Sequence, residues 1–273
     1  MNNSMITAMM SMSGLQQKLD LLSDNIANVD TVGYKRKVGT FEDLLTTLKQ
    51  QPEAFNQPGR LTPLGFNQGW GSRLTMVQPD FSQGPMKQTD GPLDVAIEGN
   101  ALFEVKVDDA GHLGYTRGGS FQTTFTKNGI NILTTKEGYP VSSADGSSIE
   151  IPPEVKEFRI DASGNVIGTM PSGEIVPLGQ LKLVQVDKPS LITQVADNLF
   201  AIADGVNKAD VIHTVTASAE SKIAIKQGFL EQSNVVLTDE MTELIGVQRA
   251  YSLSARALTS SDTMMGLANN LRA

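Results

Sequence analysis

The sequence predicts an α+β protein in which long N- and C-terminal helices form a coiled-coil-like pair and enclose a β-rich, antiparallel middle. Three observations support this prediction. Apolar residues recur at helical spacing at both ends of the 273-residue chain. Short alternating segments between turn residues fill the middle. Finally, no regular alternation of strand and helix signals indicates a parallel sheet.

The N-terminal segment carries one apolar row at helical spacing. Its members step by three and four residues through nearly four heptads, which favours a coiled coil over a globular surface helix. The row comprises Met5, Ala8, Met12, Leu15, Leu19, Leu22, Ile26 and Val29. It stops near Val29, and Gly33 stands where a helix C-cap can lie. The polar stretch 22–36, LSDNIANVDTVGYKR, is then either a frayed helix end or a shaped junction.

The C-terminal segment shows a heptad repeat. Its main row comprises Leu230, Leu237, Leu244, Tyr251, Leu258 and Met265, and a weaker companion row comprises Met241, Val247, Ala255 and Ala268. We expect one helix over roughly residues 233–271, about 55–60 Å long at 1.5 Å per residue. Acidic residues lie in its early turns and arginines later, as the helix macrodipole prefers.

Between the two ends the pattern changes to short elements. FEDLLTTL at 41–48 suits a short helix, and the Gly- and Pro-containing residues 54–72 suit a loop or extended linker. From about residue 93 to 225, alternating segments end in turn signals, which predicts antiparallel strands. Examples are ALFEVKV, FRID, VIGTM and LKLVQV.

Composition and charge exclude several classes of function. Lys and Arg number 22 against 30 Asp and Glu, a net charge of −8. Nucleic acid and acidic membranes are therefore poor partners. The absence of cysteine excludes disulfides, thiolate metal sites and cysteine catalysis. No basic region precedes the apolar MITAMMSM, no A-x-A site follows it, and no apolar run is long enough to span a membrane. We therefore expect neither a cleaved signal peptide nor membrane insertion.

No catalytic or cofactor-binding constellation stands out. His112 in an expected hairpin turn and His213 in an expected strand are interpreted as structural. Trp70, between glycines, fits loop packing better than a binding anchor. No nucleotide-binding, hydrolase or zinc-protease motif occurs. We predict no catalytic residue, no cofactor and no metal.

The energetics of the two terminal helices indicate a need for neighbours. The eight N-terminal row residues contribute on the order of 10–20 kcal/mol when buried. Ordering some thirty residues costs roughly 30–45 kcal/mol of backbone entropy, which hydrogen bonds and a partner helix offset only in part. This favours helices that order fully within an assembly. The competing interpretation is an intramolecular helical hairpin that caps a β domain.

Three blocks resemble one protein family. LSDNIANVDTVGYKR is similar to the N-terminal signature of bacterial flagellar rod and hook proteins. TDGPLDVAIEGNALFEV, followed by YTRGGSF and EGYPV, resembles the central block of that family. GFLEQSNVVLTDEMTELIGVQRAYSLSARALTSSDTMMGLANNLR resembles its C-terminal signature. The departures are Asp24, Asp30, Ala101, Leu102 and Ser254, which affect turns and helix contacts.

The resemblance implies an axial structural protein of the flagellum. Such a protein leaves the cell through the flagellar type III export apparatus and polymerises helically with itself and with other rod and hook proteins. It would lie in the extracytoplasmic part of the basal body, as part of the drive shaft that transmits torque. The chain length favours a rod subunit of the distal-rod-like branch, with a proximal rod or hook-type subunit as the alternative. Residues 54–72 are expected to contact neighbouring subunits.

The expected parts of such a subunit map onto this chain. Residues 1–33 and 230–273 are predicted to form an inner-tube domain, 34–92 and 205–229 a connecting region, and 93–204 a β-rich outer domain. The predicted subunit-assembly seam comprises Met5, Met12, Leu15, Leu19, Leu22, Ile26, Val29, Leu237, Met241, Leu244, Tyr251, Leu258 and Met265. The predicted junction between helix and outer domain comprises Asn25, Asn28, Gly33, Tyr34 and Lys35.

Two hypotheses of other classes stay open from the residues alone. A secreted β-rich adhesin or binding module with a helical stalk would form a stable oligomer when isolated and would have a ligand pocket within residues 93–204. A β-sandwich enzyme would need a reactive constellation that the sequence does not show.

Overall fold

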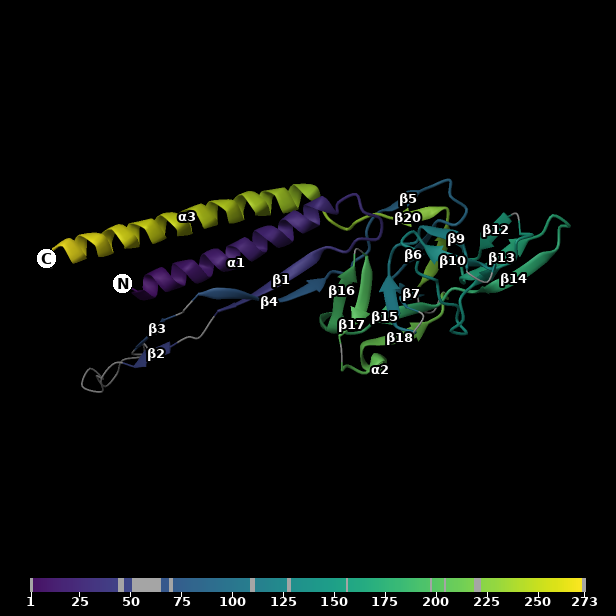
Figure 1. Cartoon of the computed structure of the whole chain (residues 1–273), viewed down its shortest axis with the longest axis horizontal. Coiled ribbons are helices and arrows are strands. Elements are labelled where there is room, and N and C mark those ends of the chain that lie inside the picture. The colour runs from purple at the N-terminus through teal and green to yellow at the C-terminus, as the bar shows by residue number, and fades with distance from the viewer. Residues whose placement is uncertain are drawn as a thin grey trace. The chain divides into compact units, whose positions relative to one another are not determined.

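The computed structural model describes residues 2–43, 47–50, 65–68, 71–108, 111–126, 129–155, 157–196, 198–203, 205–218 and 222–271 (Figure 1). The chain divides into two compact units. Unit 1 comprises Met1–Ile26, Val38–Val77 and Leu237–Ala273, and unit 2 comprises Ala27–Lys37 and Gln78–Val236. Each unit is described by itself.

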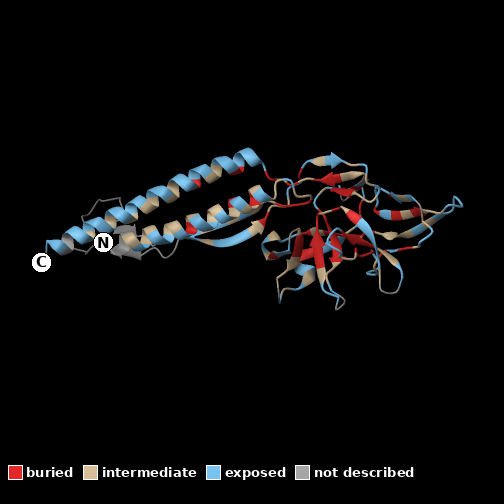
Figure 2. Ribbon diagram, turned by 45° about the horizontal axis from the view of Figure 1, so that its top comes forward, coloured by how far each residue is buried: buried red, intermediate tan, exposed pale blue. Residues whose placement is uncertain are grey.

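Unit 1 contains the two long helices, as the apolar periodicity predicts. The N-terminal helix α1 spans Asn2–Ala27 and the C-terminal helix α3 spans Leu237–Asn270. They lie side by side (Figures 1 and 2), and the Nζ atom of Lys18 in α1 is 2.5 Å from a carboxylate oxygen of Glu243 in α3. Among the described residues, neither α1, α3 nor any shorter helix combines the length and the apolar character of a membrane span.

Two strand pairs among the described residues of unit 1 correct two sequence predictions. Strand β1 (Lys37–Asp43) pairs with β4 (Ser72–Pro79), and β2 (Thr47–Gln50) pairs with β3 (Gly65–Gln68). The predicted helix over 41–48 is wrong, since its described residues lie in β1 and β2. The predicted loop over 54–72 is wrong at 65–68 and at Ser72. Residues 44–46, 54–64, 69 and Trp70 lie outside the described residues.

Packing against α1 explains why residues 37–43 form a strand. Every second side chain from Lys37 to Glu42 is shielded, the two-residue period of a strand. On the shielded side, a Cβ at Gly39 would lie 3.2 Å from the Leu21 side chain of α1. Phe41 places its ring 5.9 Å from Nζ of Lys18. These contacts with α1 outweigh the local helix-like spacing of the apolar residues.

Unit 2 is built around a six-stranded sheet. The strands run in the order β16-β17-β8-β7-β15-β18, and their pairings are antiparallel, as predicted. They are β7 (Leu102–Lys106), β8 (Leu113–Thr116), β15 (Leu183–Val186), β16 (Ile192–Ala196), β17 (Leu199–Ile202) and β18 (Ile212–Val215).

Both faces of this sheet are covered by apolar cores. Phe103 of β7 belongs to the larger core and packs edge-to-face on Phe121, with ring centroids 5.1 Å apart. Leu102, one residue earlier and therefore on the other face, belongs to a second core that contains Phe200. Figure 2 shows most of the buried residues, in red, in the β-rich unit 2 and few in the two long helices. The predicted strand ALFEVKV is a central strand of the sheet.

Smaller sheets surround the larger core. Strands β11-β10-β9 and β12-β13-β14 form two three-stranded sheets, and β19-β6 and β20-β5 form two pairs. The strands are β5 (Met86–Gln88), β6 (Val95–Glu98), β9 (Phe121–Phe125), β10 (Asn131–Thr135), β11 (Glu150–Ile151), β12 (Glu157–Ile160), β13 (Asn165–Thr169), β14 (Ile175–Gln180), β19 (Ala224–Gln227) and β20 (Phe229–Glu231). The described residues also form the short helices η2 (Pro189–Leu191) and α2 (Lys208–Val211). The predicted FRID, VIGTM and LKLVQV strands correspond to β12, β13 and β15.

Candidate assembly and junction site

The two histidines lie at the surface. His112 is in the loop between β7 and β8, and its Nδ1 atom is 3.2 Å from a carboxylate oxygen of Asp108. His213 is in β18, with Nδ1 2.7 Å from Asp187. Within the described residues, no group of three His, Asp or Glu side chains is arranged to hold a metal ion. Buried polar contacts lie elsewhere, between the end of α1 and the start of α3 in unit 1, and between residues 33–36 and 231–234 in unit 2.

In α1, the predicted seam residues lie on one partly shielded side. Leu22 is buried, and the remaining residues are half-buried. The half-buried residues are Met5, Met12, Leu15, Leu19, Ile26 and, just beyond the helix, Val29. Their role in assembly stays a prediction.

In α3, the predicted seam residues divide into two groups. Leu244, Tyr251, Leu258 and Met265 are half-buried, whereas Leu237 and Met241 are 38% and 48% exposed. The companion-row residue Val247 is buried. The shielded row of α3 therefore follows the heptad from Leu244 to Met265 and does not include the two exposed positions.

A polar contact joins the two helices where α1 ends and α3 begins. The side-chain amide of Asn25 donates to a carboxylate oxygen of Glu240 at 3.2 Å, with both residues buried. The sequence places Asn25 in the junction between helix and outer domain, and that role stays a prediction. It does not predict that Glu240, which is 1% exposed, is buried, because acidic residues in a first helical turn are usually solvated.

After α1, the chain turns sharply through the predicted junction. The Thr31 amide donates to the Asn28 carbonyl oxygen at 3.2 Å, and the Tyr34 amide donates to the Thr31 carbonyl oxygen at 3.3 Å. Gly33 has φ +72°, and a Cβ there would lie 2.5 Å from the Gly118 backbone nitrogen. Only glycine fits both the left-handed backbone and this close approach. Gly33 is therefore a turn residue beyond the helix and not its C-cap, since α1 ends at Ala27.

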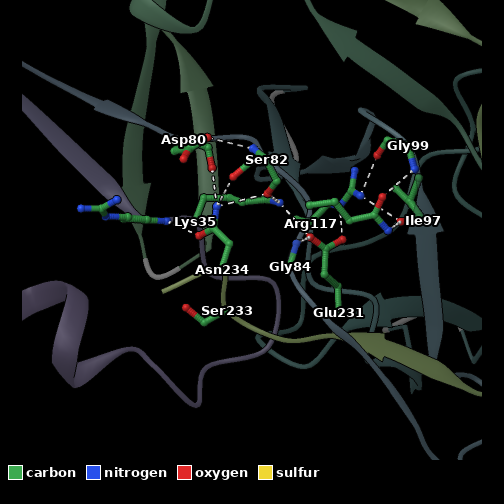
Figure 3. Close-up of polar contacts among 12 residues, drawn as sticks. Lys35, Asp80, Ser82, Gly84, Ile97, Gly99, Arg117, Glu231, Ser233 and Asn234 are labelled. Atoms are coloured by element: carbon green, nitrogen blue, oxygen red, sulfur yellow. Dashed lines mark hydrogen bonds and ion pairs between the residues drawn. The ribbon is translucent and has the colours of Figure 1, made fainter. Parts of the chain in front are cut away.

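Lys35 enters a buried charge cluster in unit 2 (Figure 3). Its Nζ atom donates to Glu231 Oε1 at 2.8 Å and to the Ser82 carbonyl oxygen at 2.7 Å. The other carboxylate oxygen of Glu231 accepts from Nε of Arg117 at 2.6 Å. The side chains of Lys35, Glu231 and Arg117 are each 1% exposed. We call these three residues the junction cluster.

Backbone groups complete the hydrogen bonds of the junction cluster. The guanidinium of Arg117 donates to the carbonyl oxygens of Ala101, Ile97 and Gly99, the last two at 2.8 and 2.7 Å. The Gly84 amide donates to Oε1 of Glu231 at 2.9 Å. A buried charge is tolerated only when it is paired and hydrogen-bonded, and these contacts meet that requirement.

Two cations share one carboxylate in this cluster, and their pKa values reflect it. Burial lowers the pKa of Lys35 below its usual 10.5, and the charge of Arg117 lowers it further, while Glu231 opposes both effects. Burial also lowers the pKa of Arg117, against the opposing effect of Glu231. The carboxylate of Glu231 thus holds two desolvated cations in place.

Asn234, three residues after Glu231, connects the segment that follows α1 with the segment that precedes α3. Its Oδ1 atom accepts from the Arg36 amide at 2.7 Å, and its Nδ2 atom donates to the Asp80 carbonyl oxygen at 2.9 Å. The Gly33 amide also donates to the Glu231 carbonyl oxygen at 2.8 Å. Residues 33–36 and 231–234 therefore lie side by side within unit 2.

The sequence indicates only part of the junction. It identifies Gly33, Tyr34 and Lys35, and Tyr34 is 2% exposed. It does not assign Arg117, Glu231 or Asn234 to the junction, although all three lie within segments that carry the family resemblance, YTRGGSF and GFLEQSNVV. Their position in those segments is the signal that could have found them.

Unit 1 has two long helices with apolar rows, unit 2 has a buried charge cluster, and the described residues show no catalytic or metal-binding group, which is the character of a structural subunit. Comparison with known proteins gives a more specific class of protein. Residues 5–35 match the family described as flagella basal body rod protein, residues 96–168 the flagellar hook protein FlgE/F/G D1 domain, and residues 226–271 the flagellar basal body rod FlgEFG protein C-terminal family.

Full-length relatives agree with these matches. The chain is 32% identical to the flagellar hook-basal body complex protein FlhP of Bacillus subtilis, over 100% of both chains. It is 32% identical to the flagellar basal-body rod protein FlgG of Borreliella burgdorferi, over 100% of this chain and 99% of the relative. It is 31% identical to FlgG of Bacillus subtilis over 100% of both. The chain belongs to the flagellar basal-body rod protein family, whose members are structural proteins and not enzymes.

Proposed function

We propose that the chain polymerises helically through its terminal helices into the rod of the bacterial flagellum, and that this rod transmits torque to hook and filament. The mechanism is mechanical. Helices from many copies pack side by side, so that rotation of the base turns the whole shaft. Within this packing, the apolar seam residues of α1 and α3 hold the two helices together as a coiled-coil-like pair.

The observation that carries the proposal is the exposed apolar surface of the two helices. Nine large apolar side chains among the described residues of α1 and α3 are exposed in the single chain. They are Ile6, Met9, Met10, Leu237, Met241, Ile245, Leu253, Met264 and Leu267. Each contributes about 1.5–3 kcal/mol when fully buried, so neighbouring copies would gain considerable stability by covering them.

The division of the chain follows from the same proposal. Residues 1–33 and 230–273 form the inner tube, 34–92 and 205–229 connect it to the outside, and 93–204 form the outer layer. The junction cluster supports this assignment, because within unit 2 it joins Lys35, which follows the first inner-tube segment, to Glu231, at the start of the second. We place the chain in the distal-rod-like branch, with the proximal-rod and hook-type positions as alternatives.

Location and partners complete the proposal. The chain reaches the extracytoplasmic basal body through the flagellar type III export apparatus, without a cleaved signal peptide, and contacts other rod and hook proteins. The names of its relatives, such as basal-body rod protein FlgG, support this location. Nucleic acid and membrane insertion have no part in the proposed role.

Electron microscopy of basal bodies from a strain that lacks the chain tests the proposed function. We expect assembly to stop within the rod, and the point at which it stops distinguishes the distal from the proximal position. Normal rods and hooks in that strain would overturn the proposal. Limited proteolysis of the purified chain adds a second test: a rod subunit gives a mostly monomeric chain with protease-sensitive ends, whereas a stalked binding module gives a stable oligomer.

A further inference from the structure

Helix α3 has a second apolar row, on the side turned away from its shielded row. At 100° per residue, this second row lies about half a turn from Leu244, Tyr251 and Leu258. It comprises Met241, Ile245, Arg249, Leu253, Arg256, Met264 and Leu267, all exposed. It contains two arginines and no carboxylate. We call it the arginine face of α3.

Neither arginine has an ion-pair partner in the described part of the chain. Arg249 and Arg256 lie seven residues apart, which places both near the middle of the arginine face. Apolar side chains lie before, between and after them. The face is therefore suited to a helix that offers carboxylates and apolar side chains in a matching row.

Helix α1 presents a row of that kind. Ile6, Met10, Ser13, Gln17, Asp20 and Asp24 step by four and three residues along one side of α1. The first five of these residues are exposed and Asp24 is half-buried, and Met9, 52% exposed, lies beside them. The row contains carboxylates and no cation. We call it the aspartate face of α1.

We propose that the arginine face of α3 in one copy docks on the aspartate face of α1 in a second copy. This inference rests on the proposed self-assembly of the chain and specifies which surfaces meet. With the helices antiparallel and Arg256 opposite Asp20, Leu267 lies opposite Met9, because each of these apolar residues is eleven positions from its charged partner. Charge and apolar contacts therefore match in a single register.

This register differs from the contact within one chain. Within the chain, Lys18 meets Glu243 and Asn25 meets Glu240. Between copies, Arg256 lies opposite Asp20. Compared with the helix pair within one chain, the α3 that docks on α1 is therefore shifted by roughly 20 Å along the helix axis, at 1.5 Å per residue. The arginine face and the aspartate face are different surfaces, so the contact is heterologous. A pair of copies therefore keeps one free arginine face and one free aspartate face. Repeated, the contact gives an open polymer.

Disulfide trapping tests this pairing directly, because the natural chain has no cysteine. In the proposed register Ser13 lies opposite Thr263 of the neighbouring copy. We expect the double variant Ser13→Cys with Thr263→Cys, in isolated basal bodies under mild oxidation, to give a ladder of linked copies on non-reducing gels. The matched control, Ser13→Cys with Ser261→Cys, places the second thiol at the same level on the opposite side of α3, and we expect no ladder.

Charge reversal provides the second test. Asp20→Arg or Arg256→Asp alone should reduce incorporation into rods at least about tenfold, because like charges then face each other. The double variant, or co-expression of the two single variants, should restore incorporation to within about twofold of the natural chain, since opposite charges face each other again. Glu174→Arg, an exposed hairpin position in unit 2, is the control for net charge and should incorporate normally.

The outcomes separate this inference from the proposed function. Rods that contain the natural chain, together with no ladder and normal incorporation of both single reversals, would overturn the pairing and leave the proposed function standing. Absence of the natural chain from rods would overturn both. A ladder in the Thr263 pair, with loss and rescue in the charge variants, supports the pairing.

Discussion

The Nζ atom of Lys35 donates a 2.8 Å hydrogen bond to the carboxylate of Glu231, a residue 196 positions further along the chain, and both side chains are 1% exposed. The first residue follows α1 and the second precedes α3. Within unit 2, their contact therefore joins the residues that follow α1 to the residues that precede α3. Arg117 donates to the other oxygen of the same carboxylate, so that one buried carboxylate neutralises two buried cations.

Glu231→Gln should destabilise unit 2 strongly. The substitution removes the only negative charge of the junction cluster and leaves the cations of Lys35 and Arg117 buried beside each other. Breaking a buried pair in this way costs about 3–5 kcal/mol. Urea denaturation followed by far-UV circular dichroism measures the change, and hydrogen exchange should show faster exchange in β5 and β20.

An exposed ion pair provides the control for Glu231→Gln. Lys226 and Glu98 are 2.8 Å apart with side chains 44% and 48% exposed. Glu98→Gln should cost at most about 1 kcal/mol, because solvent screens the pair. If Glu231→Gln and Glu98→Gln lower the free energy of unfolding equally, burial does not make the junction cluster more stabilising than an exposed ion pair.

The terminal helices were predictable, whereas of the junction cluster only Lys35 was, for a physical reason. A helix can be predicted from a short stretch of sequence, because apolar residues such as Leu15, Leu19 and Leu22 recur at the helical period. The cluster instead combines single charged residues from three distant segments. Nothing near Arg117 or Glu231 in the sequence marks either as buried, because a partner that neutralises a charge is found only once the chain has folded.

The error at 41–48 has a related cause. Phe41, Leu44, Leu45 and Leu48 follow the spacing of a helix, and the local pattern favours one. The observed β1 instead places Gly39 and Phe41 against α1, a contact that no short window of sequence contains. Tertiary packing decides between the two structures when an element is this short.

The lowered pKa of Lys35 predicts a specific dependence of stability on pH. The unfolded chain holds the Lys35 proton up to about pH 10.5, whereas the folded chain releases it at lower pH. Between these two pKa values unfolding takes up a proton, so the free energy of unfolding rises with pH and the gain is complete above 10.5.

Comparison with Lys35→Met isolates that effect. The variant lacks the titrating group but keeps the other ionisable residues. The difference in unfolding free energy, natural chain minus variant, should therefore increase as pH rises toward 10.5. Denaturant titrations between pH 7 and 11 measure it, and a difference that falls with pH would mean that the attraction of Glu231 outweighs desolvation.

Gly33→Ala should destabilise unit 2 by more than the usual cost of a left-handed alanine. At φ +72° a non-glycine residue costs about 1–3 kcal/mol, and the added Cβ would also lie 2.5 Å from the Gly118 nitrogen. Gly146, at φ +80° and with no atom within 4 Å of the place that a Cβ would take, separates the two effects. Gly146→Ala should show the backbone cost alone, and equal losses at both sites would rule out a steric role for Gly33.

Leu19→Asp or Leu244→Asp should abolish incorporation into rods and leave unit 2 folded. Both residues belong to the predicted seam and are half-buried in unit 1. A carboxylate there loses about 1.5–3 kcal/mol of apolar burial and adds a desolvation cost. Hydrogen exchange of residues 78–236 checks the folding of unit 2, and immunoblots of isolated basal bodies check incorporation. Gln248→Asp, exposed on α3, is the control and should incorporate. Motile cells with normal rods that contain either seam variant would show that the seam has no part in assembly.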